Sequence, residues 1–152
     1  MARSAPPPHD ALPTGAWRTD VLVRFSHCDP AGIVYFARYF DMLNGVVEDW
    51  FSVALGLDYH AFIRDRRVGL GYAHAGIDYA RPGRMGEILT FAPLVERVGG
   101  ASLTLSVPAH AGREGVLVAR LVIATTDLDR HRSIPLPDDL RAAVMAYQEH
   151  CR

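Results

Sequence analysis

The 152-residue sequence contains no lysine and only two cysteines, and no stretch approaches the roughly 18 apolar residues that a membrane-spanning helix needs. Cys28 and Cys151 lie far apart in the chain, so we expect no disulfide framework and a reducing cytoplasm. The formal net charge of −1 does not indicate a nucleic-acid or anionic-membrane partner. A polyanionic ligand would therefore have to be held by a local cluster of arginines.

Residues 1–15 contain several prolines and no continuous apolar core, so they do not match a secretory signal. We expect this segment to be a flexible, Pro-rich tail. The remaining residues, 16–152, have the length of a single domain, since domains commonly contain about 100–200 residues. The composition, 49% hydrophobic and 22% charged, is ordinary for a soluble globular protein with a sizeable core. These features together predict a cytoplasmic protein.

Two patterns of hydrophobic spacing divide the domain. From Phe36 to Leu55 apolar residues recur every three or four positions, which predicts a long, deeply buried helix that Gly56 ends. Elsewhere strand patterns dominate, and a curved antiparallel sheet around this helix would give an α+β fold with edges that oligomerisation would cover. The predicted strands cover 17–25, 68–80, 88–98, 101–109 and 116–127, with a short helix near 60–64 and an amphipathic helix over 138–150.

The turn that precedes the long helix holds the leading candidate for a catalytic residue. In Asp29-Pro30-Ala31-Gly32 the proline ring fixes φ, and Gly32 accepts a positive φ without steric cost. A carboxylate at such a junction is held in place and partly exposed to a ligand. Asp29 is therefore the candidate, and a turn or N-cap aspartate that only satisfies backbone N–H groups is the structural alternative.

The run from His27 to Tyr35, HCDPAGIVY, followed by Tyr39, resembles the signature of the 4-hydroxybenzoyl-CoA thioesterases, which are hotdog-fold acyl-CoA thioesterases. The similarity extends over about residues 21–127. It implies a hotdog fold, in which an antiparallel sheet wraps around a long central α-helix. It also implies homodimers or dimers of dimers (homotetramers), with active sites at the subunit interface. The implied reaction is hydrolysis of an acyl-CoA to the free acid and CoA, with no cofactor beyond the coenzyme A of the substrate.

The resemblance also implies roles for individual residues. Asp29 would be the catalytic carboxylate, acting as nucleophile or as general base toward water. The backbone N–H of Gly69 would donate to the oxyanion that develops on the thioester carbonyl. The predicted substrate-binding residues are Gly32, Tyr35, Phe36, Tyr39, Arg81, Arg84 and Arg97, with the three arginines as candidates for phosphate contacts.

Three positions depart from the family pattern. Family members often have Asp where His27 stands and an acid where Asn44 stands, and some have Tyr or His where Phe36 stands. The basic cluster that contacts CoA phosphates in some relatives would fall near 98–100 and is missing. We expect an aromatic, benzoyl-type acyl group. The alternatives are a short aliphatic acyl-CoA, an acyl carrier protein thioester, or a non-catalytic acyl-CoA-binding protein with the same fold.

Other reactive residues fit ordinary roles better. His27 beside Cys28 would be a different nucleophilic scheme, but adjacent residues of an extended segment point to opposite faces. We interpret His74 as a structural histidine, and Glu48, an alternative carboxylate on the helix, as a solvated or interface charge. The seven histidines show no HExxH motif and no Cys/His ligand spacing, so no metal site is expected.

Overall fold

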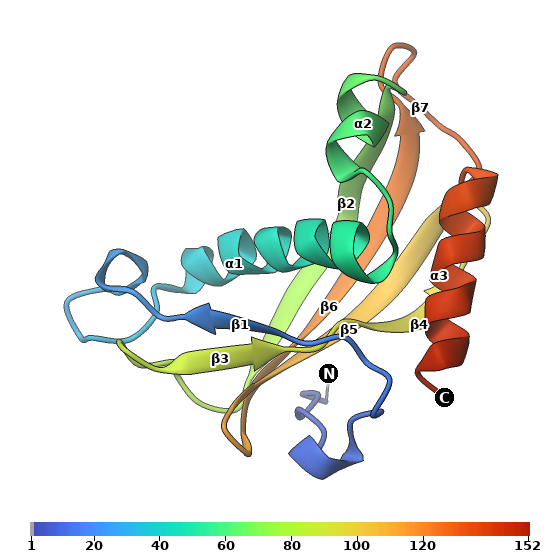
Figure 1. Ribbon diagram of the computed structural model, residues 1–152. Helices are drawn as coiled ribbons and strands as arrows, with labels where there is room; N and C mark the ends of the chain where they lie inside the picture. The colour runs from blue at the N-terminus through green and yellow to red at the C-terminus, as the bar shows by residue number, and fades with distance from the viewer. Residues whose placement is uncertain (1) are drawn as a thin grey trace.

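The computed structural model describes residues 2–152 and contains one antiparallel sheet with three α-helices against it (Figure 1). The main path of the sheet is β1-β3-β5-β6-β2, while β4 also pairs with β5 and β7 with β6. The strands are β1 (Thr19–Leu22), β2 (Val68–Tyr79), β3 (Ile88–Phe91), β4 (Leu94–Val98), β5 (Ser102–Ala111), β6 (Glu114–Asp127) and β7 (Arg132–Ser133). The helices are α1 (Phe36–Asp49), α2 (Tyr59–Arg64) and α3 (Asp138–His150).

The centre of the core lies on β5 and β6, the strands with the most buried residues. Leu105 pairs with Leu121 across these strands, and Val107 pairs with Ala119. All four side chains are almost completely buried, since α1 covers one side of this part of the sheet. Burial of Leu and Val side chains at this density contributes roughly 1.5–3 kcal/mol per residue, so this pair of strands anchors the fold.

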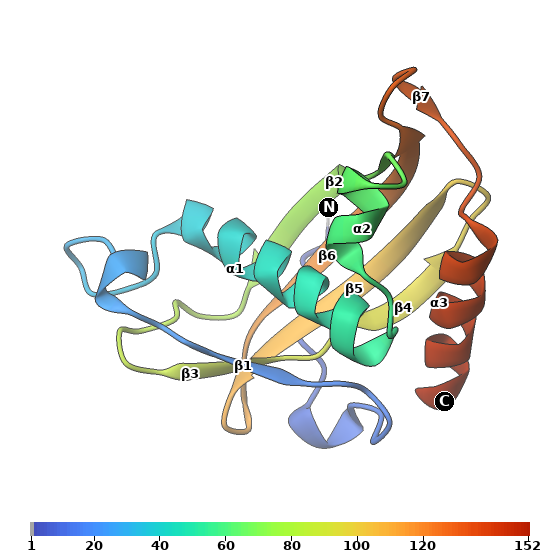
Figure 2. The ribbon, with the colours of Figure 1, turned by 45° about the horizontal axis from the view of Figure 1, so that its top comes forward.

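Helix α1 lies across the concave side of the sheet and is followed by a π-helix from Trp50 to Ala54 (Figures 1 and 2). The α-helical part has 14 residues and the π-helical part five. The expected long helix, deeply buried and wrapped by the sheet, is not confirmed in that form, because its α-helical part has only 14 residues and Phe36 and Phe40 on it are exposed. Gly56, with φ of 68°, ends this helical segment as predicted.

The predicted strand over 88–98 is two strands in the structure. It breaks at Ala92 and Pro93, because the proline has no N–H to donate to a ladder. Likewise the predicted strand 17–25 is shorter, because residues Phe25–His27 form a 3₁₀ turn. The final helix has the predicted bounds.

The segment expected to be a flexible tail lies in contact with the sheet. The backbone N–H of Ser4 donates to Asp78 on β2 at 3.0 Å, and the carbonyl of Pro7 contacts Nε2 of His110 on β5 at 2.8 Å. A 3₁₀ turn over His9–Ala11 follows, and Leu12 is buried. Prolines keep the segment extended, so it reaches partners on strands far away in the sequence.

Strand β2 forms one edge of the sheet. On its outer side it pairs with no other strand of residues 2–152, although it is 12 residues long. Its middle part, from Gly71 to Ala75, is exposed. Such an edge offers a row of free N–H and C=O groups to another strand. Within the described chain, no helix is both long and apolar enough to cross a bilayer.

Candidate active site

Asp29 lies in a tight hairpin, here called the Asp29 hairpin, which comprises residues 28–34. Cys28 and Val34 form its bridge, and the N–H of Asp29 donates to Ile33 O at 3.0 Å. The N–H of Gly32 donates back to Asp29 O at 3.0 Å, and Gly32 adopts a positive φ of 77°, which glycine accepts without steric cost. The turn expected from the sequence is therefore present, and it ends two residues before α1.

Asp29 is half-buried, and its carboxylate is held at one oxygen. Oδ1 accepts a hydrogen bond from the N–H of Ala31 at 2.8 Å. The hairpin is in turn attached to the turn after β2, since Val34 N donates to Gly83 O at 2.9 Å and Met85 N donates to Gly32 O at 3.0 Å. The hairpin is thus held by backbone contacts on both sides, and within residues 2–152 the second carboxylate oxygen of Asp29 accepts no hydrogen bond.

The N-terminus of α1 follows this hairpin. Tyr35 precedes the helix and its N–H donates to His27 O at 2.9 Å, while no side chain caps the first turn. The first N–H groups of a helix have no intrahelical acceptor, and the helix dipole adds partial positive charge there. Phe36 is the first residue of α1, so its backbone lies where this positive end begins.

A pocket of about 320 Å³, the hairpin pocket, adjoins the hairpin and brings together three of the predicted substrate-binding residues, Phe36, Tyr39 and Arg81. Tyr39 is buried and its hydroxyl accepts the N–H of Gly83 at 2.8 Å. Burial raises the pKa of Tyr39 above its ordinary value. The pocket is lined by Arg3, Ile33, Val34, Phe36, Tyr39, Tyr79, Ala80, Arg81 and Pro82.

Arg81 has its charge compensated within the chain. Its guanidinium forms a two-pronged pair with Glu87 at 2.9 and 2.8 Å, and Nε lies 2.9 Å from Glu114 Oε1. Only 12% of its side chain is exposed. These partners raise the pKa of Arg81, and the guanidinium lowers the pKa of Glu87. Because two carboxylates already hold Arg81, the geometry makes it a structural residue and gives no support to the predicted phosphate contact.

The other predicted arginines differ in position. Arg84 is exposed in the turn that holds the hairpin, where it is bridged to Ile33. Arg97 lies on β4 beside α3, at the other end of the sheet from the start of α1 (Figure 1). In one chain the structure therefore brings Arg84, but not Arg97, to the Asp29 hairpin. Tyr35 is exposed next to Phe36, with the two rings edge to face.

Gly69 lies at the start of β2, close to α2 and at the opposite end of α1 from the hairpin (Figure 1). The N–H of Leu128 donates to Arg67 O at 3.0 Å. Because hydrogen-bonded pairs alternate along an antiparallel ladder, Gly69, opposite Thr126, directs its N–H toward β6. A Cβ at Gly69 would lie 2.3 Å from Thr126 Oγ1. The glycine thus permits close packing, and within one chain the structure does not bring its amide to the Asp29 hairpin.

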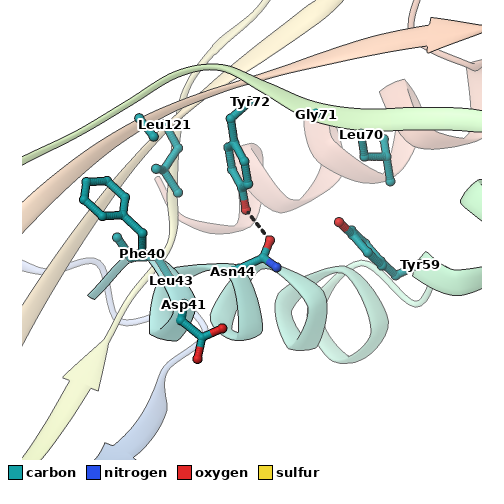
Figure 3. A pocket seen from close by; sticks show the side chains of 10 residues that line it. Phe40, Asp41, Leu43, Asn44, Tyr59, Leu70, Gly71, Tyr72 and Leu121 are labelled. Atoms are coloured by element: carbon teal, nitrogen blue, oxygen red, sulfur yellow. Dashed lines mark hydrogen bonds between the residues drawn. The ribbon is translucent and has the colours of Figure 1, made fainter. Parts of the chain in front are cut away.

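A second pocket of about 550 Å³, the strand-edge pocket, lies between α1 and β2 (Figure 3). The Tyr72 hydroxyl donates to Asn44 Oδ1 at 3.1 Å across it, and burial raises the pKa of Tyr72. The pocket is lined by Phe40, Asp41, Leu43, Asn44, Tyr59, Leu70, Gly71, Tyr72, Ala75 and Leu121. Tyr72 and Tyr59 were not predicted from the sequence, because nothing local distinguishes them from core tyrosines.

The remaining candidates line neither the hairpin pocket nor the strand-edge pocket. His27 Nδ1 accepts the N–H of Arg24 at 2.9 Å, and Cys28 Sγ lies 3.4 Å from Arg24 O, so each has a backbone partner of its own. Glu48 lies 3.9 Å from His60 at the surface. His74 is exposed on β2. Within residues 2–152 no three His, Cys, Asp or Glu side chains gather as a metal site would require.

Comparison with known proteins gives a consistent group of relatives. The sequence pattern of the family described as the thioesterase-like superfamily matches residues 23–144. A 1,4-dihydroxy-2-naphthoyl-CoA hydrolase of Synechococcus elongatus is 28% identical over 121 residues, which cover 79% of this chain and 88% of that protein. A thioesterase superfamily structure from Jannaschia is 26% identical with a TM-score of 0.81, covering 89% of this chain and 94% of that one. A 1,4-dihydroxy-2-naphthoyl-CoA thioesterase structure from Synechocystis, 20% identical, has a TM-score of 0.78 over 86% and 96% of the two chains, and this likeness concerns the fold.

Proposed function

The chain belongs to the thioesterase-like superfamily, and we propose that this thioester hydrolase cleaves an aromatic, benzoyl-type acyl-CoA into the free acid and CoA. The Asp29 hairpin carries the proposal, because it presents the carboxylate of the half-buried Asp29, held through one oxygen at 2.8 Å, in the turn that precedes α1. The relative from Synechococcus elongatus, named for an aromatic naphthoyl-CoA, supports the aromatic acyl group.

The chemistry would run through Asp29 by one of two routes. As a general base, its free oxygen takes a proton from water while the water oxygen bonds to the thioester carbonyl carbon. The tetrahedral oxyanion then collapses, the C–S bond breaks, and CoA leaves as thiolate. As a nucleophile, the Asp29 oxygen itself attacks, CoA thiolate leaves, and water hydrolyses the resulting mixed anhydride. A general base typically contributes about 10²–10⁴ in rate.

The oxyanion needs hydrogen-bond donors, and loss of one such donor typically costs about 2.7–4 kcal/mol. In place of Gly69, we propose the free backbone N–H groups at the start of α1, beginning with Phe36. Two observations support this choice: no side chain caps this helix end, and Phe36 lines the hairpin pocket beside the Asp29 hairpin. A backbone donor also explains why Phe36 needs no polar side chain for this role.

The acyl group would enter the strand-edge pocket. Phe36 of the hairpin pocket and Phe40 of the strand-edge pocket are four residues apart on α1, so they are neighbours on one helix face. A thioester near Asp29 would thus extend an aromatic ring toward Phe40 and Leu43. The hydroxyl of Tyr72 and the side-chain amide of Asn44 would offer neutral hydrogen-bonding groups to a substituent on that ring.

We also propose that the working unit is a homodimer paired through β2, either alone or within a tetramer. The support is the 12-residue unpaired edge and its exposed middle. Antiparallel pairing of two copies would place the start of one β2 beside the end of the other, and Tyr79 at that end lines the hairpin pocket. The second copy would then complete the wall of the site.

The decisive test is thiol release from benzoyl-, hydroxybenzoyl-, phenylacetyl-, butyryl- and palmitoyl-CoA. Fast turnover of the aromatic thioesters supports the proposal, whereas preference for butyryl-CoA would replace it with a short-chain thioesterase. Binding of these thioesters with no thiol release would make the protein a non-catalytic acyl-CoA binder. An acyl carrier protein thioester is the remaining substrate to include if only weak turnover occurs.

A further inference from the structure

We infer that the N-terminal segment, residues 2–8, forms part of the substrate site and that Arg3 binds a phosphate group of coenzyme A. The inference rests on the proposed function for the identity of the ligand. It goes beyond that function because it assigns a binding residue outside residues 23–144, which match the superfamily.

The segment is held at defined points along the sheet. Ser4 N donates to Asp78 Oδ2 at 3.0 Å, and Pro7 O contacts Nε2 of His110, whose side chain is buried with 1% of the residue exposed. Pro6 packs onto Gly115, where a Cβ would lie 2.6 Å from the proline ring. Contacts on β2, β5 and β6 therefore fix the path of the residues that follow Arg3.

These contacts place Arg3 at the hairpin pocket. Its guanidinium donates to the carbonyl of Tyr79 at the end of β2, and its side chain lines the pocket together with Phe36 and Tyr39. An arginine carries five N–H donors in a planar fork. One carbonyl uses only part of this capacity, so the remaining donors are free to face a ligand.

Arg3 is also the one uncompensated charge that lines this pocket. Arg81, the other charged lining residue, is paired with Glu87 and Glu114. Arg3 forms no ion pair within residues 2–152. The other lining residues are uncharged and mostly apolar. A pocket of this kind suits a ligand that joins an apolar chain to an anion.

An acyl-CoA has both parts, since its pantetheine arm ends in phosphate groups. Arginine is the side chain best matched to phosphate, because its fork donates two parallel hydrogen bonds to two oxygens. An anionic substituent on the acyl group is the other source of negative charge. We assign the phosphate, because the strand-edge pocket on the far side of Phe40 is where the acyl group is proposed to lie.

The test compares Arg3→Ala and Arg3→Lys with Arg113→Ala in the full chain. Arg113 pairs with Asp10 of the same segment, is exposed and does not line the hairpin pocket, so its variant is a matched control for charge loss. Each protein is assayed with the preferred acyl-CoA and with the same acyl group on pantetheine, which lacks the nucleotide phosphates. Thermal unfolding establishes that the variants are folded.

With acyl-CoA we expect Arg3→Ala to raise KM about tenfold and to leave kcat unchanged, the effect of losing a charge-assisted contact away from the reacting atoms. With acyl-pantetheine its KM should equal that of wild type. Arg3→Lys should recover part of the affinity, and Arg113→Ala should match wild type. An equal rise in KM with acyl-CoA and with acyl-pantetheine would mean that Arg3 contacts the acyl group, which would overturn the assignment. An unchanged KM with both thioesters would overturn it as well.

Calorimetric binding of free CoA separates this inference from the proposed function. Weaker CoA binding by Arg3→Ala in a protein that releases no thiol would disprove the hydrolysis and support the phosphate contact. Unchanged CoA binding by Arg3→Ala in a protein that does release thiol would support the hydrolysis and disprove the phosphate contact.

Discussion

The two pockets beside α1 differ in the charge of the residues that line them. The hairpin pocket is lined by two arginines, one compensated by Glu87 and Glu114 and one free. The strand-edge pocket contains a neutral hydrogen bond between Tyr72 and Asn44 within a largely apolar wall. The first environment suits the phosphate-bearing side of an acyl-CoA, and the second suits an uncharged ring.

This difference arises from the origin of each wall. The hairpin pocket is built by the Asp29 hairpin, the turn after β2 and the N-terminal segment, which are held together by backbone hydrogen bonds and ion pairs. The strand-edge pocket is built by one face of α1 and the free edge of β2. We therefore expect changes in the first to affect rate and stability, and changes in the second to affect the choice of acyl group.

Replacement of Asp29 by Asn should remove the proposed reactive carboxylate from the Asp29 hairpin, which adjoins the hairpin pocket. The amide keeps the hydrogen bond from Ala31 but removes the carboxylate, so kcat should fall by about 10²–10⁴. Thiol release under saturating acyl-CoA is the measurement. Asp138→Asn, an equivalent change at the exposed start of α3, should keep wild-type activity. Retention of more than about a tenth of kcat in Asp29→Asn would remove Asp29 from the mechanism.

Tyr39→Phe should weaken the structural support of the same pocket. The change removes the hydroxyl that accepts the Gly83 N–H at 2.8 Å and leaves a buried amide without a partner. Its expected cost is about 1–3 kcal/mol in the free energy of unfolding. Urea denaturation measures this loss, with Tyr35→Phe as control, since Tyr35 is exposed. Equal stabilities of the two variants would show that the Tyr39 contact does not support the pocket.

Glu87→Gln should destabilise the protein in a pH-dependent manner. Arg81 lowers the pKa of Glu87 in the folded state, so the pair adds stability at pH above the unfolded value of about 4.3, and this gain is lost as pH falls through the folded pKa. We expect the free energy of unfolding of wild type to exceed that of Glu87→Gln by about 1–2 kcal/mol at pH 7, because the side chains of Arg81 and Glu87 are only 12% and 23% exposed. The gap should narrow once the pH falls below the unfolded value of about 4.3 and close below the lowered pKa of Glu87 in the folded state. A gap that stays constant with pH would mean that the charge pair is not its cause.

Tyr72→Phe should alter selectivity with little effect on stability. Loss of one neutral hydrogen-bonding group from the strand-edge pocket should lower kcat/KM for hydroxybenzoyl-CoA about two- to tenfold and leave that for benzoyl-CoA unchanged. Tyr59→Phe is the matched control, because Tyr59 lines the same pocket without the bond to Asn44. Parallel losses on both substrates would place the acyl group elsewhere.

Local patterns in the sequence were sufficient for much of the fold. The helix start after the Asp29 turn, the positive φ of Gly32, the helix end at Gly56 and the bounds of α3 follow from turn residues and hydrophobic spacing. These features depend on residues within a few positions of one another, so the local sequence is sufficient to predict them. The resemblance carried by HCDPAGIVY likewise identified the superfamily that the comparisons show.

Long-range contacts decided the rest. The compensation of Arg81 involves Glu114, the Tyr72–Asn44 bond joins β2 to α1, and Arg3 reaches Tyr79 across 76 residues. None of these pairs has a local signal, because each partner on its own has the pattern of an ordinary surface or core residue. The sequence by itself determined where a carboxylate meets a helix start. Only the packing of distant strands decided which arginine stays free and which pocket remains neutral, since charge compensation depends on distance in space.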